Sequence, residues 1–253
     1  METIWPMGCK KLPSDKVKKL IWNDEYVGQE KLDGVRVLLH VLPTGRFAFT
    51  TRGAALDDPG KPIDITHRLP HFARFRAAGL AGTVLDGELL DPAKTSAEVA
   101  GIVNYRSAVP VPPSIHFYVF DIVRYKGQNL EQYSLRHRLR YLGAVTRMVD
   151  ALPYAHLVPL VYSAYEKTSL MDRVFQSGGE GIVLKNIGSK YYQGKKKADT
   201  WYKVKRSDTI DVIITGSKPP EQYYKDPSTG ATHLDRITKP WGEGWIGSLE
   251  FKF

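Results

Sequence analysis

The hydrophobic and polar positions of this chain follow both the strand period and the helix period, which predicts an α+β fold. Short runs rich in apolar and β-branched residues predict strands at residues 26–29, 35–41, 46–51, 83–90, 115–123, 180–185 and 201–205. Apolar residues at helical spacing predict helices at residues 13–22, 67–78, 96–104, 134–149 and 166–176, although Pro70 interrupts the second of these. The run 115–123 is almost continuously apolar, so we expect it to be a central strand.

The helical pattern is clearest at residues 134–149, where Ser134 is a candidate N-cap and the apolar residues share one face. The same segment carries four arginines, which we interpret as a solvated face rather than a DNA contact: Arg136, Arg138, Arg140 and Arg147.

Composition and charge restrict the class of protein. Hydrophobic residues make up 42% and charged residues 25% of the 253 positions, which is ordinary for a soluble globular protein. The single cysteine, Cys9, excludes a disulfide framework and a cysteine-rich zinc site. No secretory signal and no apolar run long enough for a membrane span are visible, so we expect no membrane partner. The net charge of +9 favours polyanionic partners, although lysines can also serve solubility alone.

The stretch Glu30-Lys31-Leu32-Asp33-Gly34-Val35-Arg36 reads as a turn between two strands. It holds Lys31, Asp33 and Arg36 within a few residues of one another at the rim of a sheet. A lysine at a strand end becomes a nucleophile when a second cation or partial desolvation lowers its pKa. A surface hairpin with ordinary charges is the alternative interpretation.

The predicted strand at residues 83–90 carries two carboxylates, Asp86 and Glu88, two positions apart. Side chains two apart on a strand point to the same side, so both acids are expected to face one cleft. Two such acids repel each other unless a cation such as Mg²⁺, or a network of sugar hydroxyls, lies between them. The alternative is an exposed strand end with two solvated acids.

Basic residues gather in the last part of the chain. Lys203 and Lys205 share one face of the strand at residues 201–205. Because two neighbouring ammonium groups repel each other, this arrangement favours binding of a polyphosphate. Three consecutive lysines, Lys195, Lys196 and Lys197, lie near aromatic residues and form either a nucleic-acid-binding loop or a solvated loop.

Five strand-end motifs occur in a fixed order: Lys31-x-Asp33-Gly34-x-Arg36, Arg52-Gly53, Asp86-Gly87-Glu88, Glu180-Gly181-x-x-x-Lys185 and Lys203-x-Lys205. In this order and spacing the chain resembles the covalent nucleotidyltransferases, most closely the ATP-dependent DNA ligases of the small phage or bacterial type. The resemblance covers roughly residues 25–215, and the segments Phe120-Asp121-Ile122-Val123, Lys126-Gly127 and Ser134-Leu135-Arg136 also fit it.

The resemblance implies an architecture of two domains. Residues 1–207 would form an ATP-grasp-like nucleotidyltransferase (adenylation) domain of antiparallel sheets flanked by helices. Residues 208–253 would begin an OB-fold, with strands at 211–216 and 245–251. Because an OB-fold needs about five strands, we expect this β domain to be partial and the sequence to be truncated.

The resemblance also implies roles for the catalytic residues. Lys31 would attack the α-phosphorus of ATP and carry AMP, with Asp33 helping to order Lys31 or the metal. Lys203 and Lys205 would neutralise the α-phosphate and the leaving pyrophosphate. Glu88 and Glu180 would hold the ribose and a divalent cation, Mg²⁺ or Mn²⁺.

Further residues would bind the nucleotide or the DNA. Arg36 and Arg52 would bind the ribose or the 5′-phosphate of the broken strand, and Lys195, Lys196 and Lys197 would contact DNA. Lys185 would add charge beside the adenylate phosphate, Phe120 would stack on adenine, and Glu30 would belong to the cofactor-binding set. Ligases of this type often have an acid where this chain has Gln29, and that acid contacts the adenine amino group. The side-chain oxygen of Gln29 can still accept that hydrogen bond.

The expected activity is sealing of 5′-phosphate/3′-hydroxyl nicks in double-stranded DNA, through a lysyl-AMP and then a DNA-adenylate. We expect a monomer located in the cytoplasm of a bacterial or phage-infected cell. An RNA ligase, a GTP-using capping enzyme, or a catalytically impaired nucleic-acid-binding fragment remain alternatives.

Overall fold

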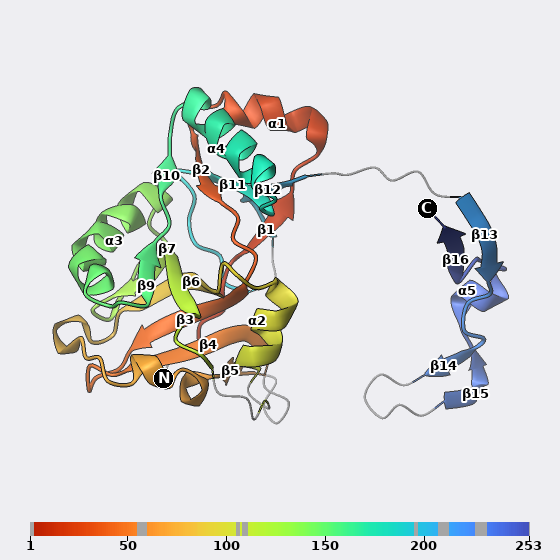
Figure 1. Cartoon of the computed structure of the whole chain (residues 1–253), viewed down its shortest axis with the longest axis horizontal. Helices are drawn as coiled ribbons and strands as arrows, with labels where there is room; N and C mark the ends of the chain where they lie inside the picture. Colours follow the sequence, from red (N-terminus) through yellow and green to blue (C-terminus); the bar gives the residue numbers. More distant parts are fainter. Residues whose placement is uncertain are drawn as a thin grey trace. The chain divides into compact units, whose positions relative to one another are not determined.

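The computed structural model describes residues 3–54, 60–104, 107, 111–194, 197–206, 213–225 and 232–252. The chain divides into two compact units, Met1–Arg206 and Ser207–Phe253, and each is described by itself (Figure 1). The assignment of the two units to an adenylation domain and the start of an OB-fold stays a prediction.

A seven-stranded sheet forms one half of the first unit. Its order is β5 (Pro62–Asp64), β4 (Phe47–Ala54), β3 (Val35–Val41), β6 (Val84–Leu90), β7 (His116–Tyr125) and β8 (Gln128–Asn129), with β9 (Ala155–Leu157) parallel to β7. The neighbours along that path are antiparallel. The predicted apolar strand is β7, which has partners on both sides.

A five-stranded sheet forms the other half. Its order is β1 (Gly8–Lys11), β12 (Lys197–Lys205), β11 (Gly181–Asn186), β2 (Tyr26–Glu30) and β10 (Leu160–Val161). Only the pair of β1 and β12 is parallel among the described pairs of this sheet. The fold is therefore the α+β arrangement of antiparallel sheets that the resemblance implied.

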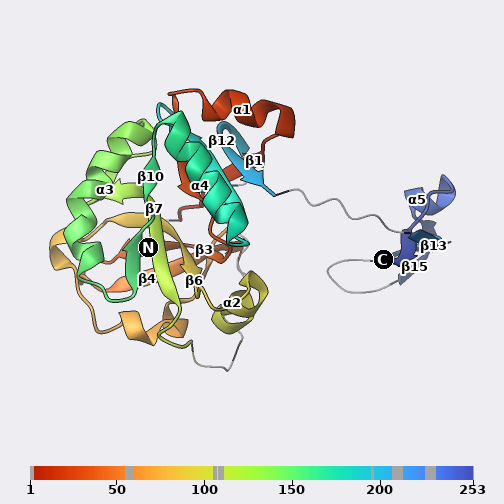
Figure 2. The ribbon, with the colours of Figure 1, turned by 45° about the horizontal axis from the view of Figure 1, so that its top comes forward.

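Helices cover both sheets (Figure 2). Helices α1 (Ser14–Ile21) and α4 (Ala164–Gln176) pack on the five-stranded sheet, against β2 and β11. Helix α3 (Leu135–Asp150) packs on β7 and β9, and α2 (Ser96–Val103) contacts β3 and β6. Ser134 caps α3 as expected, and a capping box of Ser163 and Glu166 begins α4.

Two sequence-based predictions about helices are wrong. The segment 67–78 forms separate 3₁₀ turns, Thr66–Arg68, Pro70–Phe72 and Ala78–Leu80, because a proline ring prevents a continuous helix. Arg138 is completely buried rather than solvated. Its guanidinium donates to both carboxylate oxygens of Asp121, at 2.9 and 3.0 Å, and joins α3 to β7.

Apolar side chains form three core clusters among the described residues, and one of them is shared by the two sheets. The largest cluster lies between the seven-stranded sheet, the 3₁₀ turns and α3, and includes Phe49, Phe72 and Phe117. A smaller cluster joins α1 and α4 to β11 and β12 through residues such as Leu170 and Ile182. A third cluster packs the two sheets against each other, because it joins Val27 of β2 and Trp201 of β12 to Leu38 of β3.

The second unit contains two antiparallel pairs. Strand β13 (Ile213–Lys218) pairs with β16 (Ser248–Lys252), and β14 (Tyr223–Lys225) pairs with β15 (Thr232–Ile237). A short helix, α5 (Lys239–Gly242), precedes β16. Of the predicted strand at 211–216, residues 211 and 212 lie outside the described residues, and the strand predicted from 245 begins at Ser248. The β14–β15 pair was not predicted.

Within the described residues, no helix combines the length and the apolar character that a membrane crossing requires.

Candidate nucleotide-binding site

The turn at residues 31–34 connects the two sheets rather than the two strands of a hairpin. Strand β2 belongs to the five-stranded sheet and β3 to the seven-stranded sheet. The Lys31 amide donates to the Gly181 carbonyl oxygen at 2.8 Å, which ties the turn to β11. A Cβ at Gly34 would lie 2.2 Å from the Leu89 carbonyl oxygen, so only glycine fits there. The surface-hairpin alternative is therefore wrong, and Lys31 lies where the two sheets meet.

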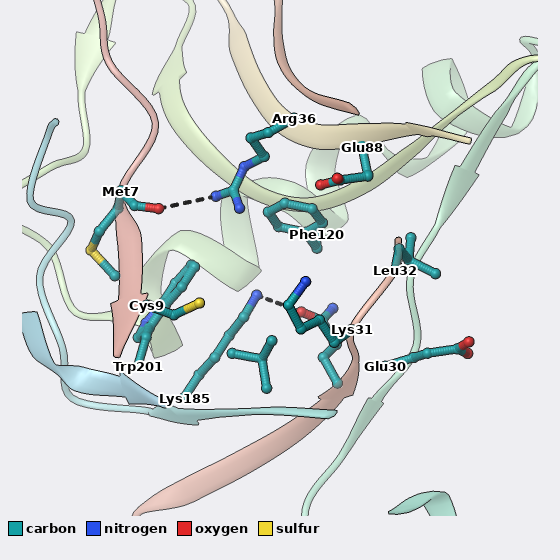
Figure 3. Close-up of a pocket in the computed structure, with 12 residues that line it drawn as sticks. Met7, Cys9, Glu30, Lys31, Leu32, Arg36, Glu88, Phe120, Lys185 and Trp201 are labelled. Carbon is teal, nitrogen blue, oxygen red and sulfur yellow. Dashed lines mark hydrogen bonds between the residues drawn. The ribbon is translucent and has the colours of Figure 1, made fainter. Parts of the chain in front are cut away.

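An open cavity lies beside this turn (Figure 3). Residues of both sheets line it: Met7, Cys9, Gln29, Glu30, Lys31, Leu32, Arg36, Glu88, Phe120, Val183, Lys185 and Trp201. The lining thus combines aromatic and apolar surface with several cationic and acidic groups, which is the usual composition of a site for a charged organic ligand.

Glu180 lies between two lysines of this region. Its carboxylate forms ion pairs with the ammonium groups of both Lys31 and Lys205. The hydrogen bond from Lys205 to Glu180 raises the pKa of Lys205 above its usual value. Asp33 is exposed, and its charge acts on Lys205 in the same direction. Four of the residues named by the sequence motifs thus form one charged cluster: Lys31, Asp33, Glu180 and Lys205.

Asp86 and Glu88 have different surroundings, contrary to the expectation that both would face one cleft. Asp86 is fully buried, and Arg36 donates to its two carboxylate oxygens at 2.6 and 2.8 Å. The Tyr191 hydroxyl donates to the same carboxylate at 2.6 Å and accepts from the Met7 amide at 3.0 Å. The cation that compensates Asp86 is therefore Arg36.

Glu88 remains a lining residue of the cavity. Burial raises its pKa to about 7, against opposing effects of Arg36 and Lys31. A carboxyl with this pKa is partly protonated at neutral pH.

Lys185 lies at the inner wall of the cavity, and its side chain is almost completely buried. Its ammonium nitrogen lies 4.7 Å from the ring centroid of Phe120 and 4.1 Å from that of Trp201. Burial lowers the pKa of Lys185 to about 7. The guanidinium carbon of Arg36 also lies over the Phe120 ring, 4.3 Å from the ring centroid (Figure 3). Two cations are thus held against one aromatic wall.

The family model of the ATP-dependent DNA ligase domain matches residues 6–205, which include both sheets and all of the cavity. The chain belongs to this family. The match covers most of the chain and includes the ordered motifs from Lys31 to Lys205.

Several curated DNA ligases are similar to the ligase domain. A DNA ligase 4 from Eremothecium gossypii is 26% identical over 236 residues, covering 81% of this chain and 23% of the relative. A probable DNA ligase from a Nocardioides species is 31% identical over 199 residues, covering 76% of this chain and 35% of the relative. The chain spans about a quarter to a third of the length of these relatives.

Solved structures share the fold at low sequence identity. The ligase domain of LigD from M. tuberculosis is 20% identical and covers 83% of this chain and 63% of that one, with a TM-score of 0.61. A Lig E DNA ligase is 20% identical, covers 92% and 83% of the two chains and has a TM-score of 0.61. The ligase of bacteriophage T7 in complex with ATP is 18% identical, with coverages of 97% and 80% and a TM-score of 0.52.

Not every predicted site residue reaches the cavity of the ligase domain. Arg52 is exposed on β4 and is not among the lining residues, and Lys203, on β12, is also absent from the lining. Glu30 lines the cavity but is exposed, and its carboxylate points away from Lys31 (Figure 3). Lys195 and Lys196 lie outside the described residues, as does the side chain of Lys197.

Sequence reasoning missed the contribution of the N-terminal segment to the ligase domain. Met7 and Cys9 line the cavity because β1 pairs with β12, almost two hundred positions later in the chain. Segment 8–11 has only four residues and no alternating pattern, so no local signal identifies it as a strand. No sequence motif indicates that Tyr191 donates to Asp86.

The carboxylates of the ligase domain fit a divalent cation that is bound partly by phosphate oxygens. Among the described residues no group of three or more His, Cys, Asp and Glu side chains could hold a metal ion. Magnesium at nucleotide sites commonly uses one or two carboxylates together with phosphate oxygens. Glu180 contacts Lys31, and Glu88 lies within the electrostatic influence of Lys31, so two carboxylates border the same lysine.

Proposed function

We propose that this chain is the nucleotide-transferring part of an ATP-dependent DNA ligase that seals 5′-phosphate/3′-hydroxyl nicks. The observation that carries the proposal is the position of Lys31 at a cavity with an aromatic wall, in an ion pair with Glu180 and close to Lys205. A nucleophilic amine, cations for phosphate and an apolar wall for a base are the parts that adenylyl transfer requires.

In the first step the uncharged Lys31 amine attacks the α-phosphorus of ATP. A nitrogen–phosphorus bond forms, the bond to pyrophosphate breaks, and the lysine carries AMP. Glu180 accepts a hydrogen bond from Lys31 beforehand, so its carboxylate can take the proton that the ammonium must lose. Lys205, with Lys203 on the same strand, would stabilise charge on the phosphates.

The base would lie along the inner part of the cavity. Phe120 offers an aromatic face there and Val183 an apolar side chain. Gln29 lies at the same wall, where Lys185 donates a hydrogen bond to it. These residues support an assignment of the cavity to adenosine.

A divalent cation, Mg²⁺ or Mn²⁺, bound together with the triphosphate would add charge neutralisation at the transferring phosphate. Glu180 and Glu88 are the carboxylates that would hold it. Binding of a cation to Glu180 would compete with Lys31 for the carboxylate, which would release the lysine from its ion pair.

DNA is the proposed acceptor of AMP, followed by attack of the 3′-hydroxyl and release of AMP. The net charge of +9 supports binding of the phosphate backbone. Arg52, exposed on β4, and the lysines at 195–197 are the proposed phosphate contacts. Arg36 is held by Asp86, so its contact with DNA would need to use the part of the guanidinium that faces the cavity.

Nick sealing and covalent labelling test the proposal together. The wild-type chain and the Lys31→Ala variant are incubated with α-labelled ATP and Mg²⁺, then with nicked duplex DNA or a matched nicked RNA duplex. We expect a labelled wild-type band, sealing of the DNA nick, and neither in the Lys31→Ala variant. Lys16→Ala, which changes an exposed lysine of α1, is the matched control. Absence of label in the wild type, or sealing only of RNA, would overturn the proposal.

A further inference from the structure

Two hydrogen bonds hold the side-chain amide of Gln29 in one orientation, one to an acceptor and one from a donor. Gln29 is 2% exposed on β2. Its nitrogen donates to the Val158 carbonyl oxygen at 2.8 Å, and its oxygen accepts from the Lys185 ammonium at 2.5 Å. A carbonyl oxygen only accepts and an ammonium only donates, so reversal of the amide would break both hydrogen bonds while Lys185 carries its proton.

Lys185 cannot easily leave this position. It lies on β11, where it is paired with Val27 of β2, and its side chain is held between the rings of Phe120 and Trp201. Its exposed fraction is 3%. The lysine is therefore a fixed donor rather than a mobile surface charge.

The oxygen end of the amide lies on the cavity side. Gln29 and Lys185 both line the cavity, whereas Val158, which receives the amide nitrogen, does not. An amide oxygen accepts two hydrogen bonds, and Lys185 uses one of them. The second accepting position is thus available to a ligand that brings a hydrogen-bond donor to the inner wall.

We propose that Lys185 is a positioning residue that holds the Gln29 amide with its oxygen toward the nucleotide, and so sets a preference for adenine over guanine. The inference rests on the proposed function, since it assumes that the cavity binds the nucleotide base. Adenine carries an amino donor at the position where guanine carries a carbonyl acceptor. The fixed oxygen accepts from the amino group and faces the guanine carbonyl without a proton between them.

The measured quantity is the ratio of covalent labelling with α-labelled ATP to labelling with α-labelled GTP, each as kcat/KM. In Lys185→Met the amide loses the donor that fixes its oxygen, and reversal then breaks only the bond to Val158. We expect the ratio of ATP to GTP labelling to fall about tenfold, the value of roughly one hydrogen bond. A residue that only added charge beside the phosphate would lower both rates together and leave the ratio unchanged.

Two further variants separate orientation from folding. Gln29→Leu removes the acceptor and should lower the ratio while Lys185 is retained. Lys185→Met combined with Gln29→Glu should restore the ratio, because a carboxylate has only accepting oxygens in either orientation. Thermal melting of each variant checks that the fold is kept, and the Gln29→Leu variant decides the question if Lys185→Met does not fold.

The expected result is a reduced ratio in Lys185→Met and Gln29→Leu and a restored ratio in the double variant. An unchanged ratio in Gln29→Leu, or a ratio that rises in Lys185→Met because the lysine itself binds the guanine carbonyl, would overturn the inference. A wild-type chain that takes label from neither nucleotide would overturn the proposed function as well, which distinguishes the two failures.

Discussion

The carboxylate of Glu180 forms an ion pair with the ammonium of Lys31, a residue 149 positions earlier in the chain. The same carboxylate pairs with Lys205. One acid thus connects the loop between the two sheets to the ends of β11 and β12 and holds two cations at the cavity. This arrangement explains how Lys31 is kept in place before a nucleotide binds.

Substitution of Glu180 by Gln is expected to slow the formation of lysyl-AMP about 100-fold. The amide cannot compensate two ammonium groups, so Lys31 and Lys205 repel each other and the lysine loses its orientation. The measurement is the single-turnover rate of labelling by α-labelled ATP. Glu25→Gln, an exposed acid beside β2, is the matched control. A Glu180→Gln rate within threefold of wild type would contradict this role.

Substitution of Asp86 by Asn is expected to destabilise the fold by about 3 kcal/mol. The change leaves the Arg36 guanidinium, which donates to both Asp86 oxygens, without a compensating charge beside a fully buried side chain. The midpoint of thermal unfolding should fall by roughly 8 °C. Asp172→Asn, at an exposed position of α4, should leave the midpoint almost unchanged. Equal midpoints for the two variants would show that the pair of Arg36 and Asp86 is not important for stability.

The raised pKa of Glu88 predicts a pH dependence of stability. Burial raises the pKa of the folded state to about 7 from an ordinary value of 4.5, so the native state binds the proton more tightly than the unfolded chain. This contribution is complete below about pH 4.5 and is lost as the pH rises through 7. The free energy of unfolding of wild type, minus that of Glu88→Gln, should therefore decrease by about 3 kcal/mol between pH 4.5 and 8. Urea titrations at several pH values measure it, and parallel curves for the two proteins would refute the assignment.

Local patterns identify the elements that carry most of the cavity. The turn at residues 30–36, the strand with Phe120 and the strand with Lys185 are recognisable because apolar runs and turn residues are local features. The ordered motifs also indicate the family. The sheet to which each strand belongs is not a local property, so the crossing of Lys31 between two sheets was not visible in the sequence.

The sequence also does not show which acid each buried arginine pairs with. The register of β3 and β6 places Arg36 opposite Glu88, yet its guanidinium pairs with Asp86, two positions away on β6. Arg138 is buried against Asp121 through the packing of α3 on β7. Both arginines occupy positions whose sequence context also fits an exposed or ligand-binding side chain. Only the tertiary arrangement distinguishes a buried structural cation from a free one.

The position of the covalent nucleotide tests the central claim most directly. The wild-type chain is incubated with ATP and Mg²⁺, digested under conditions that preserve a phosphoramidate, and mapped by mass spectrometry. We predict one adenylylated peptide, with AMP on the side-chain nitrogen of Lys31. AMP on Lys185, Lys203 or Lys205 instead, or no adenylylated peptide at all, would contradict the assignment of Lys31 as the nucleophile.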